Sequence, residues 1–455
     1  MKERMRRYGP LLAALCVFAI ASRAEAVDLS ASVAKAVTYD PTLQASNYAR
    51  QAGMEKVKQG RALYLPQISA TGGYQRMWSK TTIDAPQVFP FQVLAPLESS
   101  GDVYGYGITV KQPLYDTGIS VRATNLRDQA QLSDLNNQST RQQLLANVAQ
   151  AYFNVIVGEE TLLYIRAEKD AVSHQLAGAE ARFKAGRADA TDVQDAKARY
   201  SSMLAQEISA LNNLAEWRAR YQRSVGAPPS DLLRLPENFQ PTPPDPDDMQ
   251  TWIDRALTDN LNVRSAQVQR NSAEKQVDLY TLSGRPKLNL VASYTDTRQE
   301  GDLSILAAPA RSENKVIGLQ LSVPLYAGGG LVAKLHEAQA NSLQADAQVQ
   351  ATRSDVEVQM RKTFQDVAAG AQRIAALEQT VKASKSALDA NQLGLKAGVK
   401  TTQDVLNAEQ AYYQALEQLS QARYQYLMSK LNLDLLTGAL DETSIARVNG
   451  WLHGG

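Results

Sequence analysis

The amino-acid sequence predicts a mixed α and β membrane protein, because it combines an internal duplication, paired strand patterns of membrane-spanning length and very long helical segments. Matching segments occur in the same order in both halves of the chain, at an offset of about 210 to 220 residues. The matching pairs are 183–206 with 395–418, 108–118 with 319–329, and 36–43 with 256–263. These matches predict duplication of a unit of roughly 200 residues, much longer than a solenoid repeat.

The first 26 residues have the order of a secretory signal peptide. A basic start, MKERMRR, precedes an apolar run and then the small residues of the segment 24–26. The single cysteine, Cys16, lies in that run, and a lipoprotein signal is the rival interpretation, although Leu15 occupies the position of the expected small residue. The rest of the chain has no apolar run near the ~20 residues of a transmembrane helix, and the net charge of +1 does not suggest a nucleic-acid partner. We therefore expect a secreted, periplasmic or outer-membrane protein.

Four segments alternate apolar and polar residues with a period of two, as β-strands do. They lie near 68–78, 104–111, 288–297 and 317–323, which predicts two hairpins. Runs of about 9 to 11 residues are long enough for tilted strands to cross a bilayer. Four strands cannot close a barrel, and an open sheet edge would leave backbone groups unpaired in lipid. If these strands span a membrane, two, three or four copies must join to give eight, twelve or sixteen strands.

The longest helical segments span 119–185 and 330–397, which corresponds to about 100 Å each at ~1.5 Å per residue. Each ends at a glycine turn, Gly186 or Gly398, and is followed by a return helix of about half that length, at 190–225 or 402–436. Half-length helices are also predicted at 29–63 and 248–282. Two half-length helices stacked end to end match one long helix, so the simplest architecture is a hollow helical tube continuous with a barrel.

The predicted organisation follows from these elements. It comprises a signal peptide (1–26), a first repeat (27–226), a proline-rich linker (227–247), a second repeat (248–437) and a C-terminal tail (438–455). Proline excludes helix from most of the linker, so the linker and the tail are expected to form an equatorial belt at mid-height.

At these residues the chain resembles the TolC family of outer-membrane efflux proteins. The resemblance covers nearly the whole mature chain and includes LYLPQISATGGY, both PLY joins between strand and helix, and RFKAGRADATDVQDAKARY at the first tip. It implies a homotrimer with a twelve-stranded barrel in the outer membrane and a helical tunnel in the periplasm. It also implies a periplasmic adaptor protein and an inner-membrane pump or ABC exporter as partners.

The resemblance further implies that the helical tips close the duct and open like an iris. Thr191 and Asp192 on the first tip would face Lys400 on the second, and Asp404 would contribute to an acidic ring. The rival interpretation of both aspartates is helix capping, since Thr401 and Asp404 have the spacing of a capping box.

Two residues depart from the pattern of the family. Leu395 replaces a tyrosine that bonds to the first tip, and Asn407 replaces a second ring aspartate. We expect fewer polar links in the lock and about half the negative charge at the constriction.

Aromatic residues are expected to lie near the strand ends and to form membrane-interface belts, with packing in a soluble sheet as the rival interpretation. They are Tyr74, Trp78, Tyr104, Tyr106, Tyr115, Tyr294 and Tyr326. The connecting loops, 79–102 and 296–313, are expected to be extracellular. The apolar segment 89–91 would act as a lid or pack among the three copies.

No catalytic or cofactor motif is convincing. The glycines at 328–330 lack the Gly-Lys-Ser/Thr ending of a phosphate-binding loop, and His336 has no second histidine at the spacing of a zinc site. We therefore expect no enzyme activity, no cofactor and no metal. The predicted function is a passive exit duct for efflux of small molecules, type I protein secretion, or both. The alternatives are a structural periplasmic coiled-coil protein or adhesin, which leaves the hairpins unexplained, and a diffusion porin, which leaves the helices unexplained.

Overall fold

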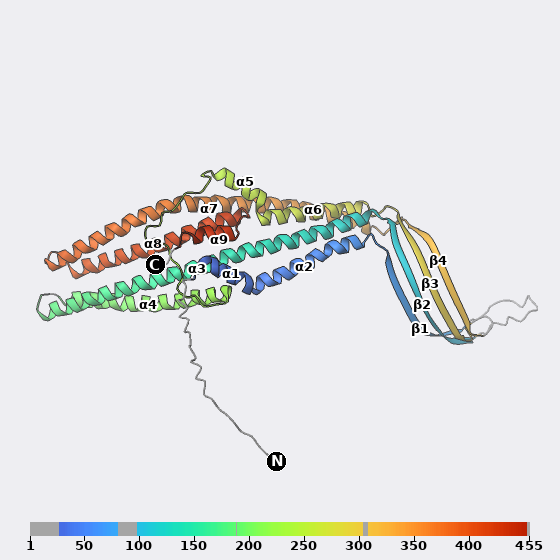
Figure 1. The fold of residues 1–455 in the computed structure, drawn as a ribbon, viewed down its shortest axis with the longest axis horizontal. Coiled ribbons are helices and arrows are strands. Elements are labelled where there is room, and N and C mark those ends of the chain that lie inside the picture. The colour runs from blue at the N-terminus through green and yellow to red at the C-terminus, as the bar shows by residue number, and fades with distance from the viewer. Residues whose placement is uncertain (1–26, 81–97, 188, 304–307, 453–455) are drawn as a thin grey trace, which may run out of the picture.

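The computed structural model describes residues 27–80, 98–187, 189–303 and 308–452. A β-sheet lies at one end of an elongated molecule, and helices run from it to two hairpin tips at the opposite end (Figure 1). This confirms the expected mixed α and β fold. The predicted signal peptide and the apolar segment 89–91 lie outside the described residues. Among the described helices, none combines the length and the hydropathy of a membrane span.

The sheet contains four antiparallel strands in the order β1-β2-β3-β4. They are β1 (Gln67–Lys80), β2 (Glu98–Tyr115), β3 (Lys287–Gly301) and β4 (Ala310–Ser322). The two expected hairpins are therefore joined by direct pairing of β2 with β3, which come from different repeats. The register shifts at Pro113, because proline has no N–H to donate to the ladder. Strands β1 and β4 form the edges of the sheet in a single chain.

The strands are longer than the 9 to 11 residues predicted, with 14, 18, 15 and 13 residues in order. The start of β2, ESSGDV, has no alternation of apolar and polar residues, yet it pairs with β1 and β3 through its backbone. The loops predicted at 79–102 and 296–313 are therefore shorter in the structure, because the strands take up part of each. β1 continues to Lys80, and β2 begins at Glu98.

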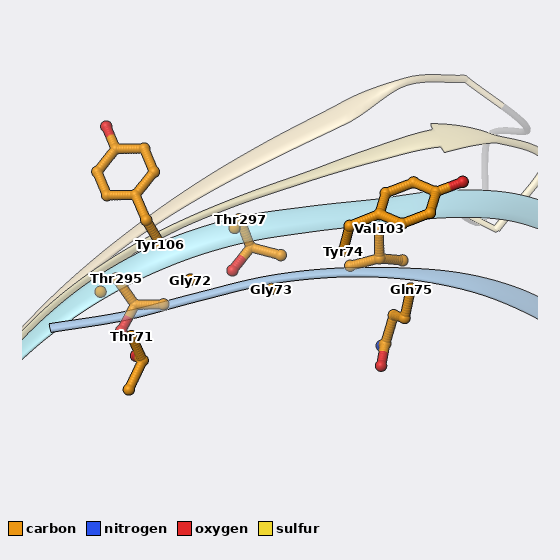
Figure 2. Close-up of a pocket in the computed structure, with 11 residues that line it drawn as sticks. Thr71, Gly72, Gly73, Tyr74, Gln75, Val103, Tyr106, Thr295 and Thr297 are labelled. Atoms are coloured by element: carbon orange, nitrogen blue, oxygen red, sulfur yellow. The ribbon is translucent and has the colours of Figure 1, made fainter.

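The register gives the sheet two different faces. Ile68, Val110, Ala292 and Ile317 lie side by side across the four strands, so one face is apolar near the helices. The opposite face carries mainly small or polar residues, such as Ser69, Thr109, Ser293 and Val316 in the adjacent row. Figure 2 shows Tyr74 and Tyr106 on one side of the sheet, with Thr71 and Gln75 pointing to the other.

The four principal helices form two hairpins. They are α3 (Thr117–Lys184), α4 (Ala190–Val225), α7 (Gly330–Lys396) and α8 (Thr402–Leu436). The predicted return helices, 190–225 and 402–436, coincide with α4 and α8. Asp116 caps α3 by accepting a hydrogen bond from the Gly118 N–H. Helix α3 has 68 residues, so the predicted length of about 100 Å is confirmed.

The half-length helices predicted at 29–63 and 248–282 are each broken once. The first pair is α1 (Leu29–Tyr39) and α2 (Pro41–Ala62), and the second is α5 (Met249–Asp259) and α6 (Leu261–Thr281). Asp40 accepts a hydrogen bond from the Leu43 N–H at the first break, where Pro41 starts a new helix. Asn260 caps α6 in the same way at the second break. These short polar side chains satisfy the N–H groups of a helix start, which explains why continuous helices were the wrong prediction.

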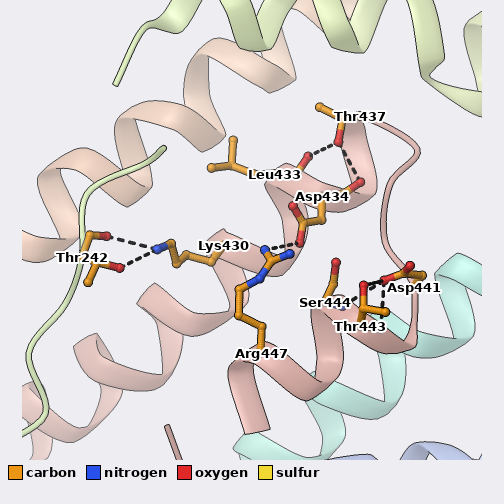
Figure 3. Close-up of polar contacts among 9 residues, drawn as sticks. All are labelled: Thr242, Lys430, Leu433, Asp434, Thr437, Asp441, Thr443, Ser444 and Arg447. Atoms are coloured by element: carbon orange, nitrogen blue, oxygen red, sulfur yellow. Dashed lines mark hydrogen bonds and ion pairs between the residues drawn. The ribbon is translucent and has the colours of Figure 1, made fainter. Parts of the chain in front are cut away.

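The proline-rich linker and the C-terminal tail lie beside the middle of the helices (Figure 1). Lys430 of α8 donates hydrogen bonds to the Thr242 hydroxyl at 2.8 Å and to its carbonyl oxygen at 3.2 Å (Figure 3). The tail contains an additional helix, α9 (Glu442–Asn449), which the sequence analysis did not predict. Asp441 caps α9 by accepting from the Thr443 and Ser444 N–H groups at 2.9 Å. Arg447 of α9 lies 3.5 Å from Asp434 of α8, so the linker and the tail are both held against α8.

The largest hydrophobic core lies at this same level. Tyr152 of α3 is 0% exposed, and its ring lies near those of Phe153 and Tyr221. Its hydroxyl group is 3.0 Å from the carbonyl oxygens of both Val27 and Leu233. Burial raises the pKa of Tyr152, so the phenol remains a donor at neutral pH. This side chain therefore links α3 to the start of the described chain and to the linker.

Candidate functional site at the helical tips

Both hairpin tips have the same backbone turn. Gly186 and Gly398 have φ angles of +67° and +73°, in the left-handed region that favours glycine. The Arg187 N–H donates to the Arg182 carbonyl oxygen at 2.8 Å, and the Val399 N–H donates to the Gly394 carbonyl oxygen at 2.9 Å. These bonds satisfy carbonyl groups at the ends of α3 and α7 in the manner of a Schellman motif.

The capping box predicted at the second tip is present. The Thr401 N–H donates to Asp404 Oδ2 at 2.9 Å, and the Asp404 N–H donates to Thr401 Oγ1 at 3.1 Å. Hydrogen bonds from Thr401 lower the pKa of Asp404, and the positive charge of Lys400 lowers it further. Asp404 is therefore a stable anion in the first turn of α8.

The first tip has no matching cap. Asp189 precedes α4 without a side-chain cap hydrogen bond, while exposed Thr191 and half-buried Asp192 lie in the first turn of α4. Within the described part of one chain, the side chains of Asp192 and Lys400 form neither a hydrogen bond nor an ion pair. The expected contact between these two residues is therefore not made inside a single chain.

The structure instead joins the tips through a pair that the sequence analysis missed. Arg182 Nη2, in the last turn of α3, donates to the hydroxyl of Thr402 at 2.9 Å. Thr402 is 1% exposed at the start of α8 and Arg182 is half-buried, so the hydrogen bond is partly shielded from water. A basic residue in a last helical turn normally signals only compensation of the helix dipole. No local pattern identifies its partner 220 positions away.

Two further polar links connect α3 to α8 closer to the sheet than this pair. Gln175 Nε2 donates to Glu409 Oε1 at 3.2 Å. Glu160 accepts from the hydroxyl groups of Ser420 and Tyr424. We call these links, together with the Arg182–Thr402 pair, the α3–α8 ladder. The ladder joins one hairpin to the other, so the hairpins cannot separate without breaking or stretching it.

The aromatic residues predicted for the membrane interface lie on the apolar face of the sheet or at its joins to the helices. Four of them occupy the middle of strands rather than their ends: Tyr74, Tyr104, Tyr106 and Tyr294. Trp78 and Tyr115 lie near strand ends, and Tyr326 follows β4. The four tyrosines were wrongly predicted to lie near strand ends, because the strands extend further than predicted. They continue into a charged segment that includes the Asp296–Arg311 ion pair at 2.7 Å.

No group of three or more potential metal ligands occurs among the residues that the structure describes.

Three comparisons with known proteins agree. The family model described as "Outer membrane efflux protein" matches residues 33–227 and 252–439, one stretch in each half. The outer membrane protein TolC of Escherichia coli is 30% identical over 458 residues, which cover 98% of this chain and 90% of TolC. The alkaline protease secretion protein AprF of Pseudomonas aeruginosa is 30% identical over 419 residues, covering 91% and 85% of the two chains.

Solved structures show the same fold at lower sequence identity. The outer membrane protein VceC of Vibrio cholerae has a TM-score of 0.73 and 17% identity, over 90% of this chain and 95% of VceC. The CmeC outer membrane channel of Campylobacter jejuni has a TM-score of 0.75 and 15% identity, over 93% and 90% of the chains.

Proposed function

This chain belongs to the outer membrane efflux protein family, and on that premise we propose that three copies form a passive exit duct whose gate lies at the helical tips. As a member of the family, the chain is an outer-membrane channel protein of efflux and secretion systems and not an enzyme. The alternative of a structural coiled-coil protein or adhesin is not favoured by these relatives.

Assembly of several copies is supported by the sheet, and the choice of three copies rests on the resemblance to the TolC family. Among the described residues of one chain, no strand pairs with the outer edges of β1 and β4, and unpaired edges are not tolerated in lipid. Pairing of β1 with β4 of the next copy would close a barrel, with twelve strands for three copies. The apolar face would contact lipid, and the small polar residues would line the lumen. The first repeat (27–226), the linker (227–247), the second repeat (248–437) and the tail (438–455) are proposed as the units of each copy.

The gate is proposed to combine links within and between copies. Asp192 and Lys400 have no ion-pair partner within the described part of one chain, so both are available to the next copy. Lys400 would face Thr191 and Asp192 across that boundary. The Arg182–Thr402 pair would tie the two hairpins inside each copy. Opening then requires α7 and α8 to move away from α3 and α4.

A periplasmic adaptor protein and an inner-membrane pump or ABC exporter are the proposed partners. The family works in efflux and secretion systems, and a passive duct needs an energised pump. The surface beside the tip turns at Gly186 and Gly398 is the proposed docking surface, because an adaptor bound there can separate the hairpins.

Planar-bilayer recording of the purified protein tests the duct and the position of its gate. We expect small, cation-preferring openings in wild type and larger openings in the double variant Asp192→Ala with Lys400→Ala, because the link between copies is lost. Large openings that the double variant leaves unchanged would place the gate elsewhere. A protein that never inserts would favour the structural alternative.

Asp404 is proposed to give the closed end its preference for cations, in addition to capping α8. Asparagine retains an oxygen that can accept the Thr401 N–H but removes the charge. Asp404→Asn should therefore preserve the helix start. Both Asp404→Asn and Asp404→Ala should lose the block of conductance by divalent cations. Block that survives in Asp404→Asn would assign the residue to capping alone.

A further inference from the structure

The middle link of the α3–α8 ladder contains a buried carboxylate that forms no ion pair within the part of the chain that the structure describes. Glu409 is 1% exposed and receives a hydrogen bond from Gln175 on one oxygen. Its other oxygen, Oε2, has no hydrogen-bond partner among the described residues. An ionised carboxylate in such a place is costly, whereas a protonated one is tolerated.

The surrounding groups compensate for this charge only in part. Glu168 of α3 is 5% exposed and pairs with Arg199 of α4 at 2.5 Å, so the nearby guanidinium is shared with another acid, although its Nε has no hydrogen-bond partner among the described residues. Burial is the largest effect and raises the pKa of Glu409, the charge of Glu168 raises it as well, and the charge of Arg199 lowers it. Gln392 faces Glu409 from α7, and Tyr413 lies near it on α8. Glu409 therefore has four such neighbours, one from each of α3, α4, α7 and α8. They are an acid, a base that already forms an ion pair, and two neutral side chains.

Glu409 also lies where the hairpins meet. It comes two turns after the start of α8, in the next turn after Leu406. Leu406 packs against Val172 of α3 and against Ala196 and Met203 of α4 in a small apolar cluster. Separation of the hairpins would expose both the cluster and the carboxylate to water.

We propose that Glu409 is a proton-sensitive latch: it holds a proton more tightly while α3 and α8 are packed than when the tip opens and water reaches the carboxyl group. The inference rests on the proposed opening of the tip, and it adds a condition under which opening becomes easier. The bond that changes is the carboxyl O–H, and water accepts the proton.

The direction of the effect follows from burial. Desolvation raises the pKa of Glu409 above its ordinary 4.5 in the packed state, and hydration returns the pKa towards that value on opening. The packed state therefore binds more protons than the open one. Its stability is complete at acid pH and falls as the pH rises through the raised pKa, so alkaline conditions favour opening.

Spin labels on the two hairpins test the latch directly. Positions 180 and 414 are exposed on α3 and α8, and Cys16 is the only cysteine in the sequence, so introduced cysteines at 180 and 414 can be labelled selectively. In the assembled protein, the distance between the labels should lengthen as the pH is raised from acid conditions through the raised pKa of Glu409. Glu409→Gln, which imitates the protonated carboxyl, should keep the short distance throughout. Glu337→Gln, a change at an exposed position of α7, should behave as wild type.

Each result decides one question. A pH response in Glu409→Gln equal to that of wild type, or a wild-type distance that is constant with pH, would overturn the latch. If the distance between the labels in wild type changes with pH while the bilayer conductance does not, the latch is retained and the gate at the tip is refuted. If Glu409→Gln fails to assemble, Glu409→Met provides a second side chain of similar size that cannot titrate.

Discussion

Channels with Arg182→Gln and Thr402→Val in every copy are expected to conduct several-fold more than wild type. These changes remove the hydrogen bond that joins α3 to α8 at the tip. A hydrogen bond to a charged group contributes about 1.5 to 3 kcal/mol, which corresponds to a shift of roughly ten-fold or more in the closed–open equilibrium. Thr402→Val is nearly isosteric, so the buried position remains filled. Single-channel recording at fixed pH is the measurement.

Arg187→Gln is the matched control, because it makes the same chemical change at an exposed tip arginine. It should conduct as wild type does. If the double variant and Arg187→Gln give the same small openings, the Arg182–Thr402 pair is not part of the lock. The presence of trimers on a non-denaturing gel shows that an altered conductance does not reflect failed assembly.

Replacement of Tyr152 by alanine is expected to cause the largest loss of stability in the middle of the molecule. Removal of a fully buried aromatic side chain costs about 3 to 5 kcal/mol. The linker also loses its link to α3 through the Leu233 carbonyl oxygen. Native-state proteolysis of the segment 226–248 and thermal unfolding followed by circular dichroism should both detect this loss.

Two tyrosine variants separate packing from hydrogen bonding. Tyr152→Phe keeps the ring and loses only the hydroxyl contacts, at a cost of about 1 kcal/mol. Tyr48→Ala removes the same side chain from a site on α2 that is 68% exposed, so it should have little effect. Equal stability of Tyr152→Ala and Tyr48→Ala would contradict the proposed role of Tyr152 in the core.

The sequence was sufficient for the features that local chemistry determines. The ends of α4 and α8 were predictable because glycine turns and polar caps mark them, as at Gly398 and Thr401. The breaks at Asp40 and Asn260 carry similar signals, but the apolar pattern continues through them and suggested single helices. The extra length of β2 has no local signal, because backbone pairing with two neighbours supports residues of weak strand propensity.

The site was less predictable than the fold. The capping role of Asp404 was predictable because its partner, Thr401, is three positions away, whereas its place at the gate came only from the resemblance to the family. Arg182 and Glu409 were missed because their partners, Thr402 and Gln175, are more than two hundred positions away in sequence. A helix surface offers many polar residues, and only the packing of α3 on α8 selects which of them meet.

The pairing of β2 with β3 also determines when this protein can enter its membrane. Tyr106 and Asp296 bond to each other across these strands although they are 190 positions apart, so the first hairpin cannot find its neighbour until most of the chain has been synthesised and exported. Contacts of such long sequence separation form slowly, and the apolar strand face is exposed to aggregation in the meantime. We therefore expect the first hairpin to need protection from aggregation until residue 301, the end of β3, has emerged.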